Sequence, residues 1–411
     1  DFEVNFVTTK SQGTGSRPAP WLARETSRPL ARPIVRKARS SSRAREIVTA
    51  LLAEADVRID GPRAWDLQVR DDRLCQRILG GGTLGFGEAY MDGWWECGAI
   101  DELCSRVLRA RLDERIPRNW SDRLVALGAR IRNLQSRRRA RRSVSAHYDL
   151  GNDFFAAMLD PALQYSCAYF HGTDDLAEAQ QRKLELICRK LGLRPGMRLL
   201  DIGCGWGGLA CHAARHHGCT VVGITLSREQ QSYAARAGAG LLVEIRLQDY
   251  REVTGTFDRV VSVGMMEHVG WKNYRAYFAA AARCLDEGGI FLCHTIGGNA
   301  SRVCTDPWIH RYIFPDSMLP SAAQVTRAAE GWFVPEDVHN FGPHYDRTLL
   351  AWERNFTRSW PRFRATHGDR FGRMWRYYLL SCAGAFRARA IELFQFVFAR
   401  GGVPGGYTAV R

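Results

Sequence analysis

The chain has 411 residues and a formal net charge of +15, and 45% of its residues are hydrophobic. This length and composition predict a globular protein with a sizeable core, long enough for two domains. No apolar run approaches the roughly 20 residues that a spanning helix needs, which argues against an integral membrane protein.

The positive charge is concentrated in two segments. Residues 1–45 carry ten Lys/Arg against three Asp/Glu, and residues 121–142 carry eight Arg against one Asp. Such segments favour nucleic acid or a membrane surface with acidic lipids, although a solvated tail or helix face gives the same pattern. We interpret the first segment as a solvated tail. No nucleic-acid motif accompanies the second, so we expect no nucleic acid partner.

Twelve cysteines are scattered through the chain, several of them inside apolar patterns. This predicts buried, reduced thiols of a cytosolic protein rather than a disulfide framework. The stretch CHAARHHGC, at 211–219, contains residue types that bind zinc. It falls on a predicted helix, and no second ligand pair has zinc-site spacing, so we expect no metal site.

The first part of the chain is predicted to contain a tail and a small, mostly helical domain. Residues 1–44 are rich in Ser, Arg, Pro and Gly without an apolar period, which is typical of disorder. The helical domain is predicted over 45–120. It begins with an amphipathic helix from Glu46, followed by a short strand at 57–60.

A glycine-punctuated aromatic segment follows at 78–98, and we expect packed turns and a short helix there. Trp94 and Trp95 in this segment are predicted to be core residues or to face a membrane. Helical spacing returns over 100–116.

A basic helical linker is predicted over 121–145, and a catalytic domain over 146–411. In the second of these, strands alternate with helices, and several strands are continuous apolar runs, as expected when both faces of a sheet are covered. The fold class is therefore α/β, with a doubly wound, Rossmann-like sheet. Strands are predicted at 197–203, 220–226, 242–249, 257–265, 288–297 and 392–400, and helices at 176–192, 208–218, 228–238 and 273–286.

The stretch RLLDIGCGWGG, at 198–208, predicts a strand, a glycine loop and a helix start, which is a nucleotide-binding turn. Its glycines fit both a nicotinamide dinucleotide and S-adenosylmethionine. Asp201 favours S-adenosylmethionine, because a carboxylate suits a sulfonium and an ammonium group and repels a pyrophosphate. The second strand ends without an acid for a ribose, but Arg228 could serve NADP. An NADP-dependent oxidoreductase therefore remains an alternative.

Seven ordered segments closely resemble the cyclopropane-fatty-acyl-phospholipid synthases, relatives of the mycolic acid cyclopropane synthases. The resemblance runs from about Glu46 to Arg400. It implies transfer of a methylene group from S-adenosylmethionine to the cis double bond of an unsaturated phospholipid acyl chain. A carbocation forms, and bound bicarbonate removes its proton. The segments lie at 147–155, 165–170, 199–208, 223–230, 261–270, 291–297 and 306–321.

The resemblance also implies the site residues. Tyr169 and Phe170 are expected either to stabilise the carbocation or to line the acyl tunnel. The residues implied to hold bicarbonate and serve catalysis are Cys167, Glu267, His294, Ile296 through its backbone, and Tyr345. The residues implied to bind the cofactor are Tyr165, Ser166, Asp201, Gly203, Gly205, Gly207, Thr225, Ser227, Gln230, Asp249 and Tyr250.

A lipid substrate requires docking on a membrane. We expect a cytoplasmic protein that binds peripherally to the inner face of the membrane, through anionic headgroups and an arginine cluster, aided by Trp94 and Trp95. The resemblance implies a homodimer. Two alternatives to a cyclopropane synthase remain. One is a member of the same family that methylates a lipid or an amine without ring closure, and the other is a non-catalytic membrane-binding module. The cluster comprises Arg137, Arg138, Arg139, Arg141 and Arg142.

Overall fold

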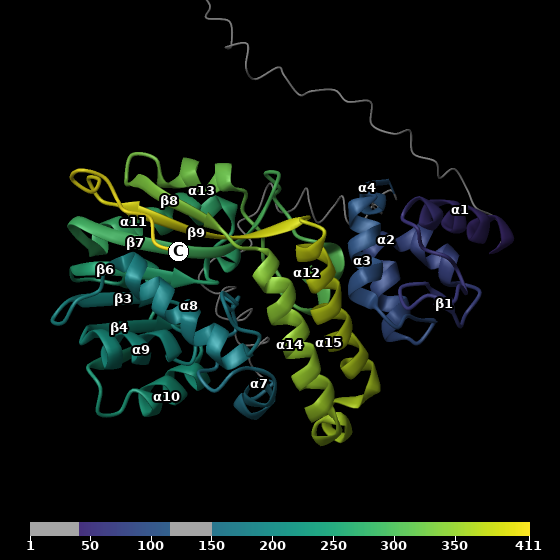
Figure 1. Ribbon diagram of the computed structural model, residues 1–411, viewed down its shortest axis with the longest axis horizontal. Coiled ribbons are helices and arrows are strands. Elements are labelled where there is room, and N and C mark those ends of the chain that lie inside the picture. Colours follow the sequence, from purple (N-terminus) through teal and green to yellow (C-terminus); the bar gives the residue numbers. More distant parts are fainter. Residues whose placement is uncertain (1–40, 116–149) are drawn as a thin grey trace, which may run out of the picture.

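The computed structural model describes residues 41–115 and 150–411, and Figure 1 shows their arrangement. A sheet with helices on both faces makes up the larger part, and a smaller helical module lies to one side of it. Residues 1–40 of the predicted tail and the predicted linker at 121–145 lie outside the described residues. Within the described ranges, no helix is both long and apolar enough to cross a membrane.

The sheet has seven strands in the order β5-β4-β3-β6-β7-β9-β8. Strands β3 to β7 pair in parallel, and β9 pairs antiparallel with both β7 and β8. This confirms the predicted doubly wound α/β fold. The strands are β3 (Arg198–Ile202), β4 (Thr220–Thr225), β5 (Val243–Leu247), β6 (Phe257–Val263), β7 (Leu285–Gly298), β8 (Val334–Asn340) and β9 (Ile391–Ala399).

Two hydrophobic clusters cover the opposite faces of this sheet. One cluster joins α8, α9 and α10 to strand residues such as Leu199 and Val221. The other joins α11 and α13 to Leu200 and Val222, because successive residues of a strand point to opposite faces. The helices are α8 (Leu176–Leu191), α9 (Gly208–His217), α10 (Arg228–Ala237), α11 (Tyr274–Cys284) and α13 (Ala322–Ala329).

The helical module corrects two predictions. Helix α1 begins at Ser41, so the predicted disordered tail is wrong at its last residues, where Ala44 is fully buried. The predicted strand at 57–60 is also wrong, because only Ile59 pairs there, in an isolated bridge to Leu67. The elements of the module are α1 (Ser41–Glu54), β1 (Gln68–Val69), α2 (Leu74–Met91), β2 (Trp95–Glu96), α3 (Ile100–Arg109) and α4 (Leu112–Arg115).

The glycine-rich segment 78–98 is largely helical, which corrects the prediction of packed turns. Helix α2 runs through it and is kinked at Gly82, where φ is 55°. Tertiary packing explains Gly87, where a Cβ would lie 2.5 Å from the ring of Trp308, but not Gly80, where a Cβ would meet nothing within 4 Å. Further along the chain, the helix predicted over 100–116 is divided into α3 and α4.

Trp95 is a core residue, and the alternative that it faces a membrane is wrong. Its side chain is fully buried, stacks on Phe86 at 4.4 Å and donates from its indole N–H to the Phe86 carbonyl oxygen over 3.0 Å. Trp94 is half-buried. The guanidinium groups of Arg73 and Arg77 each lie 4.5 Å from its ring, so cations of the protein itself already cover it.

Helices α14 and α15 connect the module to the sheet, and in Figure 1 they run between the two. Their apolar side chains share one hydrophobic cluster with those of α1, α2 and α3. Arg387, the last residue of α15, forms ion pairs with Asp101 of α3 over 2.6 Å and Asp346 of α14 over 2.9 Å. The remaining helices are α7 (Asn152–Met158), α12 (Pro307–Tyr312), α14 (Pro343–Ser359) and α15 (Arg364–Arg387).

The approach of α15 to α3 depends on Gly384, where a Cβ would lie 2.3 Å from the carbonyl oxygen of Asp101. We expect Gly384→Ala to lower the free energy of unfolding by about 1–3 kcal/mol, because the two helices must separate. Gly80→Ala is the matched control, since Gly80 lies in α2 and a Cβ added there would meet nothing within 4 Å. Thermal unfolding by calorimetry checks this, and equal melting temperatures for both variants would contradict it.

Candidate active site

A pocket lies beyond the carboxyl ends of the central strands, at the loop that follows β3. Gly203, Gly205 and Gly207 of this loop all have positive φ, between 56° and 84°, which favours glycine. The structure therefore brings most of the predicted cofactor residues together. The predicted residues that line the pocket are Tyr165, Ser166, Asp201, Gly203, Gly205, Thr225, Gln230 and Tyr250.

Three predicted cofactor residues do not line this pocket. Gly207 precedes α9 and allows close packing, since a Cβ there would lie 2.9 Å from the Cβ of Ala234. Ser227 is a helix cap, because its hydroxyl accepts a hydrogen bond from the Gln230 N–H at the start of α10. Asp249 forms an ion pair with Arg251 over 2.7 Å.

Several residues outside the predicted cofactor set also line the pocket, among them Gln248, Met265, His268 and Phe314. Trp206 belongs to the predicted glycine loop at 198–208 and lines the pocket together with it. Gln248 and His268 directly adjoin predicted residues. Burial lowers the pKa of His268 to about 4, so its imidazole is neutral. Met265 and Phe314 lie in the resemblance segments at 261–270 and 306–321, but no role was predicted for either of them.

Asp201 is the carboxylate of this pocket. It is 2% exposed, and its Oδ2 has no hydrogen-bond partner among the described residues. Burial raises the pKa of Asp201 to about 7, while the nearby Lys183 ammonium opposes the rise. A buried acceptor without a partner fits a ligand that brings a donor or a positive charge. The ammonium and sulfonium groups of S-adenosylmethionine provide both.

A second, larger cavity of about 790 Å³ opens from the first. Its volume is typical of ligand sites, and its walls are rich in aromatic side chains from both the module and the sheet. Of the five residues predicted to be catalytic, Glu267, His294, Ile296 and Tyr345 line it. The two pockets are continuous, and the residues they share are Tyr165, Ser166, Gly264, His268 and Phe314.

Cys167, Tyr169 and Phe170 line neither pocket. The Cys167 thiol is fully buried and donates to the Ala168 carbonyl oxygen over 3.2 Å. Tyr169 stacks on histidine rings, and Phe170 lies 4.3 Å from the Arg347 guanidinium. Tyr169 and Phe170 are therefore wrong as walls of the acyl tunnel. The aromatic walls come instead from Tyr165, Trp308, Phe314, Tyr377 and Tyr378.

Glu267 lies in a 3-10 turn just after β6 and is 6% exposed. Its Oε1 accepts a hydrogen bond from the Ile296 N–H over 2.7 Å, whereas Oε2 has no partner among the described residues. Burial raises the pKa of Glu267 to about 7. Near neutral pH this carboxyl can therefore hold or release a proton at Oε2. The Ile296 N–H is engaged by Glu267 rather than free to bind an anion.

His294 is in β7 and is 2% exposed. Burial lowers its pKa well below the usual value, so the imidazole is neutral. Its Nδ1 lies 3.2 Å from Gln395 Nε2, and in this orientation the amide donates to Nδ1. The imidazole proton is then on Nε2, which is buried without a partner in the described part of the chain. Nε2 is thus a donor available to a ligand.

Tyr345, at the start of α14, supplies a second donor. Its ring stacks on Phe386 of α15, with 4.6 Å between the ring centroids. Burial raises the pKa of Tyr345 well above its usual value, so the hydroxyl remains protonated. The predicted catalytic residues therefore supply the cavity with one carboxyl group and two neutral donors beside its aromatic walls.

This fold and site define a Rossmann-like methyltransferase that uses S-adenosylmethionine: the glycine loop, the buried carboxylate and the strand order all occur together. Such a protein needs a second cavity for the group that receives the methyl, and the apolar cavity beside the cofactor pocket meets that need.

Comparisons with known proteins identify the family. A family model for mycolic acid cyclopropane synthetase matches residues 135–396, so the chain belongs to this family. The cyclopropane-fatty-acyl-phospholipid synthase of Escherichia coli (strain K12) is 52% identical over 365 residues, which cover 89% of this chain and 95% of that protein. The tuberculostearic acid methyltransferase UfaA1 of Mycobacterium tuberculosis is 37% identical, over 84% of this chain and 85% of its own.

Solved structures similar to this chain support the same family. The cyclopropane synthase MmaA2 from Mycobacterium tuberculosis has a TM-score of 0.60 at 32% identity and covers 66% of this chain and 100% of that chain. The mycolic acid cyclopropane synthase CmaA1, complexed with SAH and CTAB, has a TM-score of 0.59 at 35% identity and covers 63% of this chain and 98% of that chain. The resemblance inferred from the sequence is confirmed, and the alternative of an NADP-dependent oxidoreductase is set aside.

The raised pKa of Asp201 predicts a pH-dependent affinity for S-adenosylmethionine. Below about pH 7 the carboxyl is protonated and loses its attraction for the cofactor, so Kd should rise up to about tenfold for each pH unit. Asp201→Asn should bind more weakly at pH 8 and lack this dependence. Isothermal titration calorimetry between about pH 6 and 8 measures both.

Asp258→Asn is the control, because Asp258 lies at the start of β6, at the opposite end of the sheet, where it accepts from the Arg198 N–H. It should keep the pH dependence of the wild type. A wild-type Kd that does not change with pH, or a dependence that persists in Asp201→Asn, would contradict the role of Asp201.

Proposed function

We propose that this protein is a cyclopropane fatty acid synthase. It transfers a methylene group from S-adenosylmethionine to the cis double bond of unsaturated phospholipid acyl chains. The observation that carries the proposal is the apolar cavity of about 790 Å³, which opens into the cofactor pocket and holds Glu267, His294 and Tyr345. The 52% identity to a cyclopropane-fatty-acyl-phospholipid synthase supports the same reaction.

The cavity fits the demands of this chemistry. An alkene is a weak nucleophile, so it must be held in line with the sulfonium and away from water. Its π electrons form a bond to the methyl carbon while the sulfur–carbon bond breaks, which leaves S-adenosylhomocysteine and a carbocation. Aromatic rings such as Tyr165, Phe314 and Tyr378 stabilise that cation through their faces. Loss of a proton from the added methyl carbon then closes the ring.

We propose that bicarbonate binds between Glu267, His294 and Tyr345. When bound, bicarbonate supplies the base for proton removal. Two observations support the fit: Glu267 Oε2 and His294 Nε2 are both buried without partners among the described residues. His294 Nε2–H and the Tyr345 hydroxyl donate to the anion, and Glu267 Oε2 accepts its hydroxyl proton. Cys167 and the Ile296 N–H, also predicted to bind it, are engaged by backbone and carboxylate partners.

Lipid mass spectrometry tests the reaction. Purified protein, S-adenosylmethionine, bicarbonate and vesicles of cis-unsaturated phospholipid are incubated, and the product is mildly hydrogenated. An acyl chain heavier by one CH₂ that takes up no hydrogen is the expected result. A heavier chain that still takes up hydrogen would indicate methyl transfer without ring closure, the activity class that the name of UfaA1 describes. Unmodified lipid would overturn the proposed substrate.

The variant Glu267→Gln tests the role of the Glu267 carboxyl group, because it removes the acidic group and keeps the size of the side chain. We expect kcat to fall by about 10²–10⁴-fold while S-adenosylmethionine still binds, because the carboxyl handles a proton in the cavity rather than the cofactor. Bicarbonate-free buffer should lower the wild-type rate, and added bicarbonate should restore it. A rate in Glu267→Gln equal to that of the wild type would overturn the assigned role.

We also propose that the protein binds membranes peripherally through the arginine cluster defined above, whose five residues lie outside the described ranges. The excess of positive charge in residues 121–142 supports this proposal. Trp95 is not part of the membrane contact, because its side chain is buried in the core. A homodimer stays a prediction of the resemblance.

Reversal of the five arginines to glutamate should weaken binding to vesicles rich in phosphatidylglycerol by at least about 1 kcal/mol per residue and leave binding to neutral vesicles unchanged. Co-sedimentation measures this. Reversal of Arg236 and Arg327, exposed on α10 and α13, is the control and should have little effect. Unchanged sedimentation of the cluster variant would contradict the proposal.

A further inference from the structure

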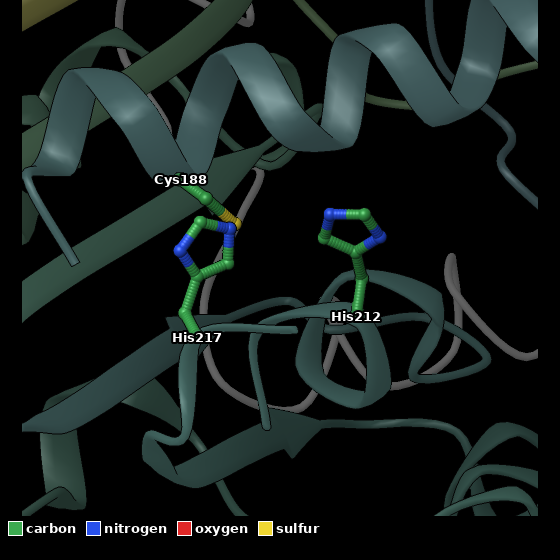
Figure 2. A group of neighbouring side chains, drawn as sticks. All are labelled: Cys188, His212 and His217. Carbon is green, nitrogen blue, oxygen red and sulfur yellow. The ribbon is translucent and has the colours of Figure 1, made fainter. Parts of the chain in front are cut away.

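A cluster of potential metal ligands lies between α8 and α9, outside the active site. Cys188 comes from α8, and His212 and His217 come from α9. Figure 2 shows the three side chains facing a common space between the two helices. One ligand atom from each lies within 4.8 Å of the others. The sequence predicts no metal site because the histidines lack a second ligand pair, and here the fold brings a thiol beside them.

Glu185, one turn before Cys188 on α8, lies beside both histidines although it is not among the three residues whose ligand atoms all lie within 4.8 Å of one another. Its Oε2 lies 3.3 Å from His212 Nε2 and 3.0 Å from His217 Nε2, so both imidazoles face a single carboxylate oxygen. Cys188 is fully buried, the two histidines are largely buried, and the Glu185 side chain is 43% exposed. The group thus has a closed inner side and one solvent-facing side through which an ion can enter.

The residue types match zinc. Zinc takes four ligands from Cys, His and Asp/Glu in a tetrahedron, with bonds of about 2.0–2.3 Å. Neighbouring ligand atoms in such a tetrahedron are about 3.3–3.7 Å apart, which the nitrogen–oxygen separations of 3.0 and 3.3 Å nearly match. Four-coordination also requires the Glu185 carboxylate and the Cys188 thiol to move toward each other, because Glu185 lies outside the group whose ligand atoms are within 4.8 Å. One thiolate and one carboxylate would balance the charge of a divalent ion, which suits a partly buried site.

We propose that Glu185, Cys188, His212 and His217 form a structural zinc site. Binding releases the thiol proton of Cys188 to solvent and forms one bond from each of the four side chains to the ion. The other buried thiol nearby, Cys219, does not take part, because its sulfur is directed to the carbonyl oxygens of Arg194 and His217.

The site holds the middle and the C-terminal end of α9 against α8, through His212 and His217. The glycine loop lies at the N-terminal end of α9, about 6 Å along the helix axis from His212 and about 14 Å from His217. None of the four ligands lines the cofactor pocket or the acyl cavity. The role of the ion is to stabilise the helix pair, and the inference does not rest on the proposed function.

Cobalt spectroscopy on the full chain tests this inference, because Co²⁺ replaces Zn²⁺ and is coloured. We expect one Co²⁺ per chain, visible bands of tetrahedral intensity and a near-ultraviolet thiolate-to-cobalt band, all displaced by Zn²⁺. Cys188→Ala should lose the thiolate band. His217→Ala should bind roughly tenfold more weakly or worse, since even loss of an outer partner costs about that much. His216→Ala, an exposed neighbour on the same helix, should match the wild type.

Thermal unfolding gives an independent readout. Zn²⁺ should raise the melting temperature of the wild type and of His216→Ala, and a chelator should reverse the rise. If Cys188→Ala fails to fold, the cobalt spectrum of the wild type and the affinity of His217→Ala for Co²⁺ still test whether the site exists. Absence of a thiolate–cobalt band in the wild type, or its persistence in a folded Cys188→Ala, would overturn the site. The cluster would then be only a hydrogen-bonded Glu185–histidine group.

Discussion

The packing of α15 against α3 is the contact on which the active-site cavity depends. At Gly384 the two helices approach so closely that no side chain fits between them, and Arg387 ties both to α14. The large cavity is lined by Phe86 and Val107 from the module, by Tyr377 and Tyr378 from α15, and by residues of the sheet. Without the module, one wall of this cavity would be open to water. The small domain is therefore part of the site as well as part of the fold.

Exclusion of water has an electrostatic consequence. Burial raises the pKa of both Asp201 and Glu267 to about 7 and keeps His294 neutral, so each carboxyl group is only partly ionised near neutral pH before the cofactor binds. A cationic cofactor then favours the ionised form of Asp201, and the carboxylate favours the cofactor in return. The same apolar surroundings that raise these pKa values strengthen each remaining electrostatic interaction with a carbocation. One physical cause, burial, thus serves cofactor binding and catalysis together.

The sequence predicted what local patterns encode. Apolar strands followed by glycine turns revealed the parallel sheet, and the loop at Asp201 revealed the cofactor pocket. Strand β8 was missed because an edge position tolerates the Pro335 and the acidic residues that disguise it. The length of helix α2 was underestimated because glycine has low helix propensity, and a tertiary contact such as that of Gly87 with Trp308 leaves no local signal.

Local sequence patterns also predicted only part of the active site. Glu267, His294 and Tyr345 follow from motifs, but Phe314 and Tyr378 enter the cavity from distant segments through packing alone. Ser227 shows the opposite error, because a motif position proved to be a helix cap. Residues that act through chemistry leave a signal in the sequence, whereas residues that act through shape become visible only when the fold brings them together.

Helix α8 illustrates how one element serves several sites. Lys183, fully buried, donates to Gln164 Oε1 and to Ser166 Oγ, and so fixes the segment that lines both pockets. Burial lowers the pKa of Lys183 to about 8, and the negative charges of Asp160 and, to a smaller extent, Asp201 oppose that fall. The ammonium and the Asp201 carboxylate therefore stabilise each other's charged forms. About a turn further on, Glu185 and Cys188 face α9. Because α9 begins at the glycine loop, α8 supports the cofactor pocket both directly, through Lys183, and indirectly, through the helix it packs against.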